Sequence, residues 1–244
     1  MYNQTIIFYF YIDNKGEIFM NYNITGSPFP IISCDLSAGE SINCQKGAMI
    51  WMTENIKMET STGGLGKMVT KAFTGESIFH NTYTAYKQPG SITFGTNCPG
   101  TIIPFNLSGG NCIIAQKGAY LASDPSINFE VFLNKKVGAG LFGGEGFIMQ
   151  KFTGNGMLFL EIDGSVIERV LAPGETLLID TGYLAAMESS VSISIDKVKG
   201  VGNVLFGGEG LFNTKVTGPG RVWLQTMPIA QFAGSIIPYI PSKG

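Results

Sequence analysis

Charged residues are scarce in this chain of 244 residues. Asp, Glu, Lys and Arg make up 14% of it, the net charge is −2 and the mean hydropathy is +0.19, whereas a typical soluble domain has about 25% charged residues. The two arginines are Arg169 and Arg221. This balance provides no positive field that would gather nucleic acid, so we do not expect a nucleic acid partner. We expect large subunit interfaces, because an obligate interface resembles a domain core cut in half.

Residues with catalytic or metal-binding side chains are also few. His80 is the one histidine, and the four cysteines, Cys34, Cys44, Cys98 and Cys112, form no C-x-x-C pair. A metal site would have to draw on scattered residues, and buried apolar thiols in a reduced chain are the better interpretation. A Ser–His–Asp or Cys–His arrangement would have to use His80. We therefore expect a protein that is not an enzyme, with no catalytic residue, no cofactor and no metal.

Long apolar runs and helical patterns are missing as well. No stretch reaches the roughly 18 apolar residues of a membrane span, and no basic segment precedes the short apolar run 6–12 as it would in a signal peptide. We therefore expect a cytoplasmic protein. Gly66–Phe73 is the best helix candidate, with one or two turns, and the tail Phe232–Gly244, with two prolines, is expected to lie over a surface without regular pairing.

Glycine, by contrast, is abundant and recurs in a pattern. The chain has 33 glycines, about 14% of its residues against a usual value of ~7%. The sequence Leu-Phe-Gly-Gly-Glu-Gly occurs at 141–146 and again at 205–210, and a degraded copy lies at 73–77. Each copy leads into a segment that alternates apolar and polar residues, which predicts a glycine turn followed by a strand. The candidate turn residues are Gly75, Glu76, Gly143, Gly144, Glu145, Gly146, Gly207, Gly208, Glu209 and Gly210.

A second landmark sets the period of the repeat. Gly39, Gly110 and Gly174 are each followed by another glycine eight residues later. The distance from this anchor to the glycine turn is 36 residues in the first copy and 34 in the other two. Two independent landmarks in the same order predict three tandem repeats. We place the boundaries at 1–96 for an N-terminal hairpin plus the first repeat, 97–163 for the second, 164–228 for the third and 229–244 for the tail.

Short strands separated by Gly and Pro corners predict an all-β fold. The hairpin is expected at 5–14 and 17–22. In the first repeat, strands are expected at 29–35, 40–45, 48–54, 55–59 and 78–84. The equivalents are 101–106, 111–116, 119–123, 127–133 and 147–154 in the second repeat, and 165–171, 176–180, 183–187, 191–195 and 211–218 in the third. We expect about eight strands per repeat, in a small sandwich or rolled barrel whose exposed sheet edges need partners.

Two motifs resemble nucleotide-binding signatures but lack their context. Residues 138–143 match G-x-G-x-x-G, but a strand pattern follows where the dinucleotide fingerprint needs a helix. Residues 62–68 resemble a P-loop but have Ser61 and Met68 at its two ends. Glu76, Glu145 and Glu209 stand at the same point of each repeat. They could form a ring of carboxylates for a cation or basic partner, or each could accept backbone N–H groups in its own turn, which we favour.

With the repeats in view, a family resemblance can be stated. The residues that carry it are Gly63 to Gly66, Phe73 to Phe79, the two Phe-Gly-Gly-Glu-Gly copies and the Pro-Gly-Glu corner at 173–175. From about residue 20 to residue 228 the chain resembles the altered-inheritance-of-mitochondria (mitochondrial biogenesis) family, in its bacterial branch of unknown function. The resemblance implies three fused copies of the fold of the trp RNA-binding attenuation protein, a short, jelly-roll-like double-stranded β-helix, and a homotrimer that closes a ring of nine repeats.

The resemblance implies little biochemistry. RNA binding in the attenuation protein needs basic and base-stacking groups on each repeat, whereas this chain has Lys151 and Lys215 at one matching position and Asn81 or Thr82 near it in the first repeat. We therefore expect a non-enzymatic, ring-forming scaffold or binding protein whose partner is another protein or a membrane surface. The alternative is RNA or small-ligand binding in the grooves between repeats.

Overall fold

The computed structural model describes residues 20–60, 80–135, 146–197 and 212–241. The chain divides into two compact units. The first holds residues 1–111, 120–130 and 153–161, and the second holds 112–119, 131–152 and 162–244. The predicted helix Gly66–Phe73, the first strand of the predicted N-terminal hairpin and all three glycine turns except Gly146 lie outside the described residues.

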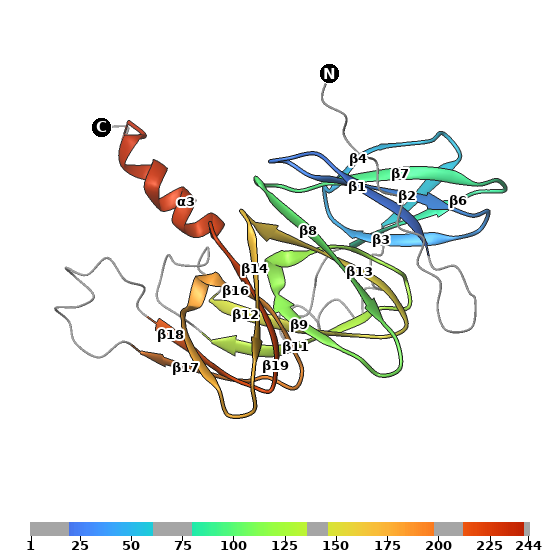
Figure 1. Ribbon diagram of the computed structural model, residues 1–244. Helices are drawn as coiled ribbons and strands as arrows, with labels where there is room; N and C mark the ends of the chain where they lie inside the picture. The colour runs from blue at the N-terminus through green and yellow to red at the C-terminus, as the bar shows by residue number, and fades with distance from the viewer. Residues whose placement is uncertain (1–19, 61–79, 136–145, 198–211, 242–244) are drawn as a thin grey trace, which may run out of the picture. The chain divides into compact units, whose positions relative to one another are not determined.

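The described residues are mostly β-strand and include one short α-helix, and the all-β character is what the alternating patterns predicted (Figure 1). The strands up to residue 95 are β1 Asn21–Thr25, β2 Ile31–Leu36, β3 Ser41–Gln45, β4 Met49–Met52, β5 Ile56–Thr60, β6 His80–Ala85 and β7 Gly90–Gly95. Those up to residue 163 are β8 Gly100–Leu107, β9 Ile113–Gln116, β10 Tyr120–Ser123, β11 Asn128–Lys135, β12 Phe147–Thr153 and β13 Gly156–Asp163. The remaining strands are β14 Val166–Leu171, β15 Thr176–Asp180, β16 Leu184–Glu188, β17 Ser192–Lys197, β18 Phe212–Thr217 and β19 Gly220–Gln225. The helical segments are η1 Lys117–Ala119, η2 Thr181–Tyr183, α3 Ile229–Ile236 and η3 Ile237–Tyr239.

Two sheets build the first unit around one core. The four-stranded sheet has the order β1-β2-β7-β4, and the six-stranded sheet has the order β5-β6-β3-β10-β13-β8. Alternate residues of their strands, such as Ile32, Cys34 and Leu36 in β2, are buried. The core also holds Phe94 and Phe159. The rings of Phe159 and Tyr22 meet edge to face, with their centroids 4.9 Å apart. The period-two pattern in the sequence therefore corresponds to inward and outward faces of these strands.

The second unit repeats this plan with its own core. Its six-stranded sheet has the order β11-β12-β9-β16-β19-β14, and its three-stranded sheet has the order β15-β18-β17. Strand β16 is buried at Leu184, Ala185, Ala186 and Met187. Of these, Leu184 and Met187 pack in a cluster with residues such as Phe147, Val216 and Val222.

The same pairings recur along the chain. Strand β7 lies between β2 and β4, β13 between β8 and β10, and β19 between β14 and β16. Likewise β6 lies between β5 and β3, β12 between β11 and β9, and β18 between β17 and β15. The described residues thus hold six strands in each predicted repeat rather than about eight. The strands of residues 100–163 are divided between the two compact units.

The C-terminal segment contains a helix that was not predicted. Residues 229–236 form α3, whereas the tail from residue 232 was expected only to lack regular strand pairing. Apolar residues at Ile229, Phe232, Ala233, Ile236 and Ile237 have the spacing of one helix face, and the prolines that suggested irregular structure lie at the start of η3 and beyond it. Asp163 accepts a hydrogen bond from the backbone N–H of Ile229 at 2.8 Å, which satisfies one of the free N–H groups at the start of the helix.

Candidate functional site

The glycine-turn candidates can be placed only in part. Gly146 is half-buried just before β12 and has a φ of 86°, a left-handed conformation that favours glycine. Gly75, Glu76, Gly143, Gly144, Glu145, Gly207, Gly208, Glu209 and Gly210 lie outside the described residues. The choice between a carboxylate ring and self-contained turns therefore stays open at these positions.

The second landmark shows how a glutamate can hold a corner. Gly39 has a φ of 85° and Gly174 a φ of 77°. The next residue in each case is a glutamate whose carboxylate accepts a hydrogen bond from a backbone N–H three residues earlier. Glu40 accepts from Ser37 at 2.7 Å, and Glu175 accepts from Ala172 at 2.8 Å. These two glutamates stabilise turns, as side chains of turn residues often do.

In the first unit, two three-stranded halves of the large sheet meet at β3 and β10. Asn43 lies opposite Ser123 and Cys44 opposite Ala122. Beside this junction the Gln45 side chain donates to the Glu161 carboxylate at 2.6 Å. Glu161, which is buried, also accepts from the backbone and side chain of Asn97. We call this strand pair the first joint.

The second unit has a matching pair, β9 with β16, which we call the second joint. Ala115 lies opposite Ala186, Ile114 opposite Met187 and Ile113 opposite Glu188. The Gln116 side chain donates to the carbonyls of Gly182 and Leu184 at 3.2 and 2.5 Å. Ile114 and Met187 are both fully buried. Apolar side chains, the backbone ladder and the amide of Gln116 hold this joint.

Strands β4 and β15 are equivalent to the two strands that pair in a joint, but each has one side without a partner strand among the described residues. Strand β4 pairs only with β7, and β15 only with β18, within the part of the chain that the structure describes. Both edges carry large exposed apolar side chains, with exposed fractions of 49% for Ile50, 53% for Trp51 and 66% for Leu178. Sequence reasoning predicted the strands but missed these residues. The signal was the apolar run at 48–52, which does not alternate as a half-buried strand should.

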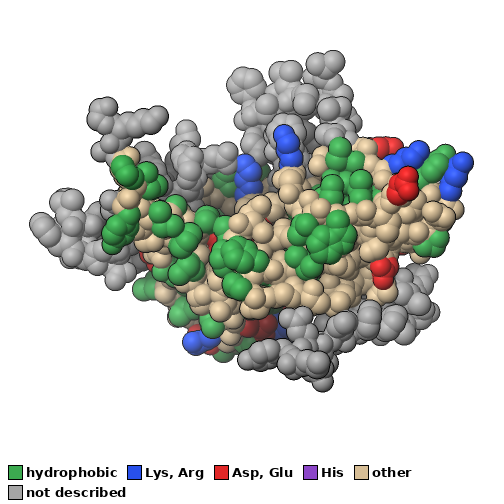
Figure 2. Space-filling model, turned by 90° about the horizontal axis from the view of Figure 1, so that it is seen from above, with side chains coloured by type: hydrophobic (Ala, Val, Ile, Leu, Met, Phe, Trp, Pro, Cys, Tyr) green, Lys and Arg blue, Asp and Glu red, His purple; other side chains and the backbone are tan. Residues whose placement is uncertain are grey.

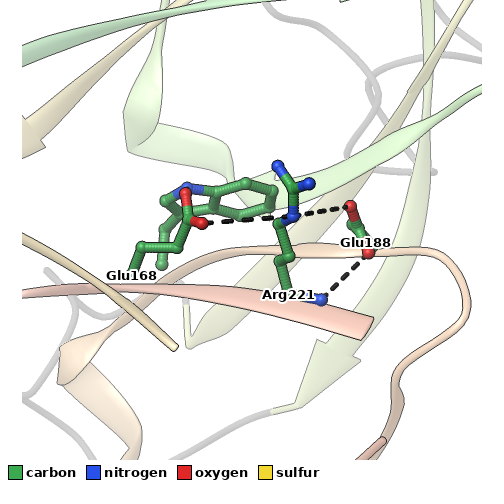
Figure 3. A network of polar contacts seen from close by, with 4 residues as sticks. Glu168, Glu188 and Arg221 are labelled. Atoms are coloured by element: carbon green, nitrogen blue, oxygen red, sulfur yellow. Dashed lines mark hydrogen bonds and ion pairs between the residues drawn. The ribbon is translucent and has the colours of Figure 1, made fainter. Parts of the chain in front are cut away.

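A polar cluster lies on β14, β16 and β19 (Figure 3). Nε of Arg221 lies 3.7 Å from the Glu188 carboxylate and 4.0 Å from that of Glu168. Glu188 also accepts a hydrogen bond from the backbone N–H of Arg221 at 2.9 Å, and Glu168 accepts one from the Trp223 indole at 2.9 Å. The side chain of Arg221 is 54% exposed, so these ion pairs are surface contacts of small energy.

One bond of this cluster has counterparts elsewhere. Thr53 Oγ1 accepts from the backbone N–H of Ser91 at 3.1 Å, and Asp124 Oδ2 accepts from that of Met157. Thr53 follows β4, Asp124 follows β10 and Glu188 is the last residue of β16. Each side chain bonds to the backbone of the neighbouring strand, which is β7, β13 or β19 respectively. Because three different residue types make the same bond, we interpret Glu188 as a structural residue of a strand corner.

Two of the four cysteines, Cys34 and Cys44, are buried in the first core, whereas Cys98 and Cys112 are half-buried. Burial raises the pKa of the Cys34 thiol well above its usual value and that of Cys44 to about 12. Such thiols are unreactive because the thiolate is disfavoured. Across the described ranges no three His, Cys, Asp or Glu side chains are grouped so that they could hold a metal ion.

A further apolar surface lies at the C-terminus. No residue of α3 is buried, and Met227, Phe232, Ile237 and Tyr239 are among the exposed large apolar residues of this segment. Figure 2 shows green hydrophobic side chains in several patches on the face that it draws, with tan surface between them. None of the helices in the described part of the chain combines the length and apolar character needed to cross a membrane.

Comparison with known proteins decides the family. The model of the mitochondrial biogenesis AIM24 family matches residues 22–227. The chain belongs to this family. An uncharacterized protein from Streptococcus pyogenes serotype M6 is 31% identical over 242 residues, which cover 95% of this chain and 94% of that protein.

A solved structure supports the fold of this AIM24-family chain. The crystal structure of a Streptococcus pyogenes protein matches it with a TM-score of 0.75 and 28% sequence identity. The match covers 91% of this chain and all of the other. The resemblance stated from the sequence is therefore confirmed at the level of the family and of its bacterial branch of unknown function.

Proposed function

We propose that this protein is a non-enzymatic scaffold that assembles with copies of itself into a ring. The observation that carries the proposal is the pair of open edges, β4 and β15, which bear exposed Ile50, Trp51 and Leu178 where the equivalent strands inside the chain are paired. A row of free N–H and C=O groups with apolar side chains is a template for pairing with another chain. The low charge of the chain supports the same proposal.

The proposal includes three tandem repeats of the fold of the trp RNA-binding attenuation protein and a homotrimer of nine repeats. The recurring strand order supports the three repeats, and the ring follows from them because each repeat then has one partner on either side. Native mass spectrometry at micromolar concentration tests it. A mass of three chains is expected, and a single chain of 26.2 kDa would overturn the proposal.

A membrane surface is the second candidate partner, because α3 and η3 expose an apolar stripe. Residues 222–242 contain no charged side chain, so contact between this segment and the apolar part of a lipid interface would remove no charge from water. The exposed residues Ile229, Phe232 and Ile236 have the spacing of one helix face in α3. We keep a cytoplasmic location as a prediction, which cell fractionation would check.

RNA or small-ligand binding is the remaining alternative. Lys151 lies opposite Ile114 and Lys215 opposite Leu178, and the same position in the first repeat, opposite Asn43, is Thr82. The basic pattern therefore has a gap in every chain. Binding of RNA that weakens steeply with salt would favour this alternative.

A further inference from the structure

The internal joints give the register for any pairing of the open edges. Strands β4, β10 and β16 are equivalent, because each pairs with an equivalent strand, β7, β13 or β19. Met52 in β4 lies opposite Ile92 in β7, Ser123 in β10 lies opposite Leu158 in β13, and Met187 in β16 lies opposite Val222 in β19. Position by position, Met52 of the open edge therefore corresponds to Ser123 in the first joint and Met187 in the second.

The other half of the joint is aligned in the same way. Asn43, Ile114 and Leu178 lie opposite Thr82, Lys151 and Lys215 in the strands that follow them. Because Asn43 pairs with Ser123 and Ile114 pairs with Met187, the residue that would pair with Met52 is Leu178. One residue along in each direction, Ile179 would lie opposite Trp51, and Leu177 opposite Thr53.

The backbone groups at both edges face the right way for this register. The N–H of Thr53 donates to Ser91 in β7 at 2.9 Å, so the N–H and C=O of the preceding residue, Met52, point to the open side. The carbonyl of Glu175 accepts from Gly218 at 2.9 Å. Since directions alternate along a strand, Leu177 and Ile179 face β18, and Leu178 faces the open side. Met52 and Leu178 can therefore exchange two backbone hydrogen bonds.

We propose that β15 of one copy pairs antiparallel with β4 of a second copy, with Leu178 opposite Met52 of the second copy. This inference rests on the self-assembly proposed above and specifies its interface. It makes β17, β18, β15, β4, β7 and β2 one continuous sheet across two chains, in the order that the six-stranded sheet already has within each compact unit.

The side chains support the pairing. At the second joint Ile114 and Met187 are 1% and 0% exposed. Their counterparts Leu178 and Met52 are also apolar but are 66% and 37% exposed. Likewise the positions of Ile50 and Trp51 are occupied by Leu121 and Ala122 in β10, both fully buried. Residues that are buried where a partner strand is present are exposed where it is missing, so a partner strand of the same kind would bury them.

The polar contacts beside the joint are not reproduced. Asp180 stands at the position of Gln45 and Gln116, and Gly95 at that of Glu161. The pairing between copies therefore rests on the backbone ladder and the apolar side chains. This difference predicts that the association depends weakly on salt.

Disulfide trapping in the full chain tests the register. The double variant Leu178→Cys with Met52→Cys places one cysteine on each side of the interface between copies. The register predicts a distance of about 5.5 Å between their Cα atoms, within the range of a disulfide. Leu177→Cys with Thr53→Cys is a second pair in the same register. Thr176→Cys with Met52→Cys is the matched control, because a shift of two residues places the Cα atoms more than about 7 Å apart. The wild-type chain controls for the four native cysteines.

Oxidation should link most chains of both in-register variants into dimers and trimers on a non-reducing gel, with little product from the control. Native mass spectrometry of the same reduced samples separates the two proposals. A trimer that is not trapped, or is trapped equally by the control, overturns the register and leaves the assembly intact. A single chain at micromolar concentration overturns both.

Discussion

Ile114 in β9 lies opposite Met187 in β16, and both side chains are buried. This pair is the apolar centre of the second joint, where two three-stranded halves form one sheet. The equivalent positions on the open edge strands β15 and β4 are Leu178 and Met52, which are exposed. The contrast between a filled and an open joint leads to the first two predictions.

A charge at Leu178 should prevent assembly. Leu178→Lys would bury an unpaired ammonium group in the interface, which costs several kcal/mol, and we expect association at least about a hundredfold weaker. Val170→Lys is the matched control, because Val170 is also 66% exposed but lies in β14, at a sheet edge that stays open in our register. Analytical ultracentrifugation over a concentration series measures both. Equal loss of assembly in the two variants would contradict the interface.

Truncation at the filled joint should destabilise the fold itself. Ile114→Ala leaves a cavity at a fully buried site and is expected to lower the free energy of unfolding by about 2 to 5 kcal/mol. Val170→Ala, at an exposed site, should change it by no more than about 0.5 kcal/mol. Urea unfolding followed by tryptophan fluorescence provides the comparison, and a cost below about 1 kcal/mol for Ile114→Ala would mean that the joint is not tightly packed.

The Glu188 cluster should depend on its hydrogen bond more than on its charge. Glu188→Gln keeps an acceptor for the Arg221 backbone N–H, and we expect it to change the free energy of unfolding by less than about 1 kcal/mol. Glu188→Ala removes the acceptor and should cost about 1 kcal/mol more than the glutamine variant. If Arg221→Ala proves as costly as Glu188→Ala, the ion pair rather than the strand corner dominates.

Asp124 should make the stability of the fold depend on pH. Burial raises the pKa of this carboxyl, with a smaller opposing effect from the Met157 N–H that it accepts and a further increase from Glu40. Because the pKa is raised in the folded state, the protonated Asp124 carboxyl stabilises the fold. Its contribution to the free energy of unfolding is complete below the pKa of about 3.9 that the group has in the unfolded chain. It is lost as the pH rises through the folded value.

The variant Asp124→Asn keeps the acceptor without the charge. We therefore expect its stability relative to the wild-type chain to increase between pH 4 and pH 7, as measured by urea unfolding at several pH values. A constant difference across this range would show that burial does not perturb this carboxyl.

The C-terminal stripe can be tested with lipid vesicles. We expect neutral phosphatidylcholine vesicles to retain the full chain in a flotation assay, and Phe232→Ser with Ile236→Ser to reduce the retained fraction several-fold, since each change removes about 1.5 to 3 kcal/mol of apolar burial. Val170→Ser, on β14, is the control. Equal retention of all three proteins would exclude α3 as the contact.

Much of the fold could be predicted from local patterns. Strands β14 to β17 were expected within one or two residues of their observed bounds, because alternation and glycine corners act over a few neighbouring residues. Helix α3 was not predicted, because Pro238 and Pro241 follow closely after the apolar residues that have helical spacing. The candidate turns were predicted from their repetition, but repetition alone does not separate a structural corner from a binding site.

The amino-acid sequence by itself determined that this chain is all-β and that it carries little charge. These properties depend on composition and on patterns within short windows, whereas the family was given first as a resemblance and then shown by the comparisons. Only the tertiary structure decided which strands meet, since Asn43 and Ser123 are separated by 80 residues in the chain and no local rule pairs them. It also decided which edges stay open, because an apolar residue such as Leu178 or Ile114 has the same chemistry in either place and differs only in whether a partner strand covers it.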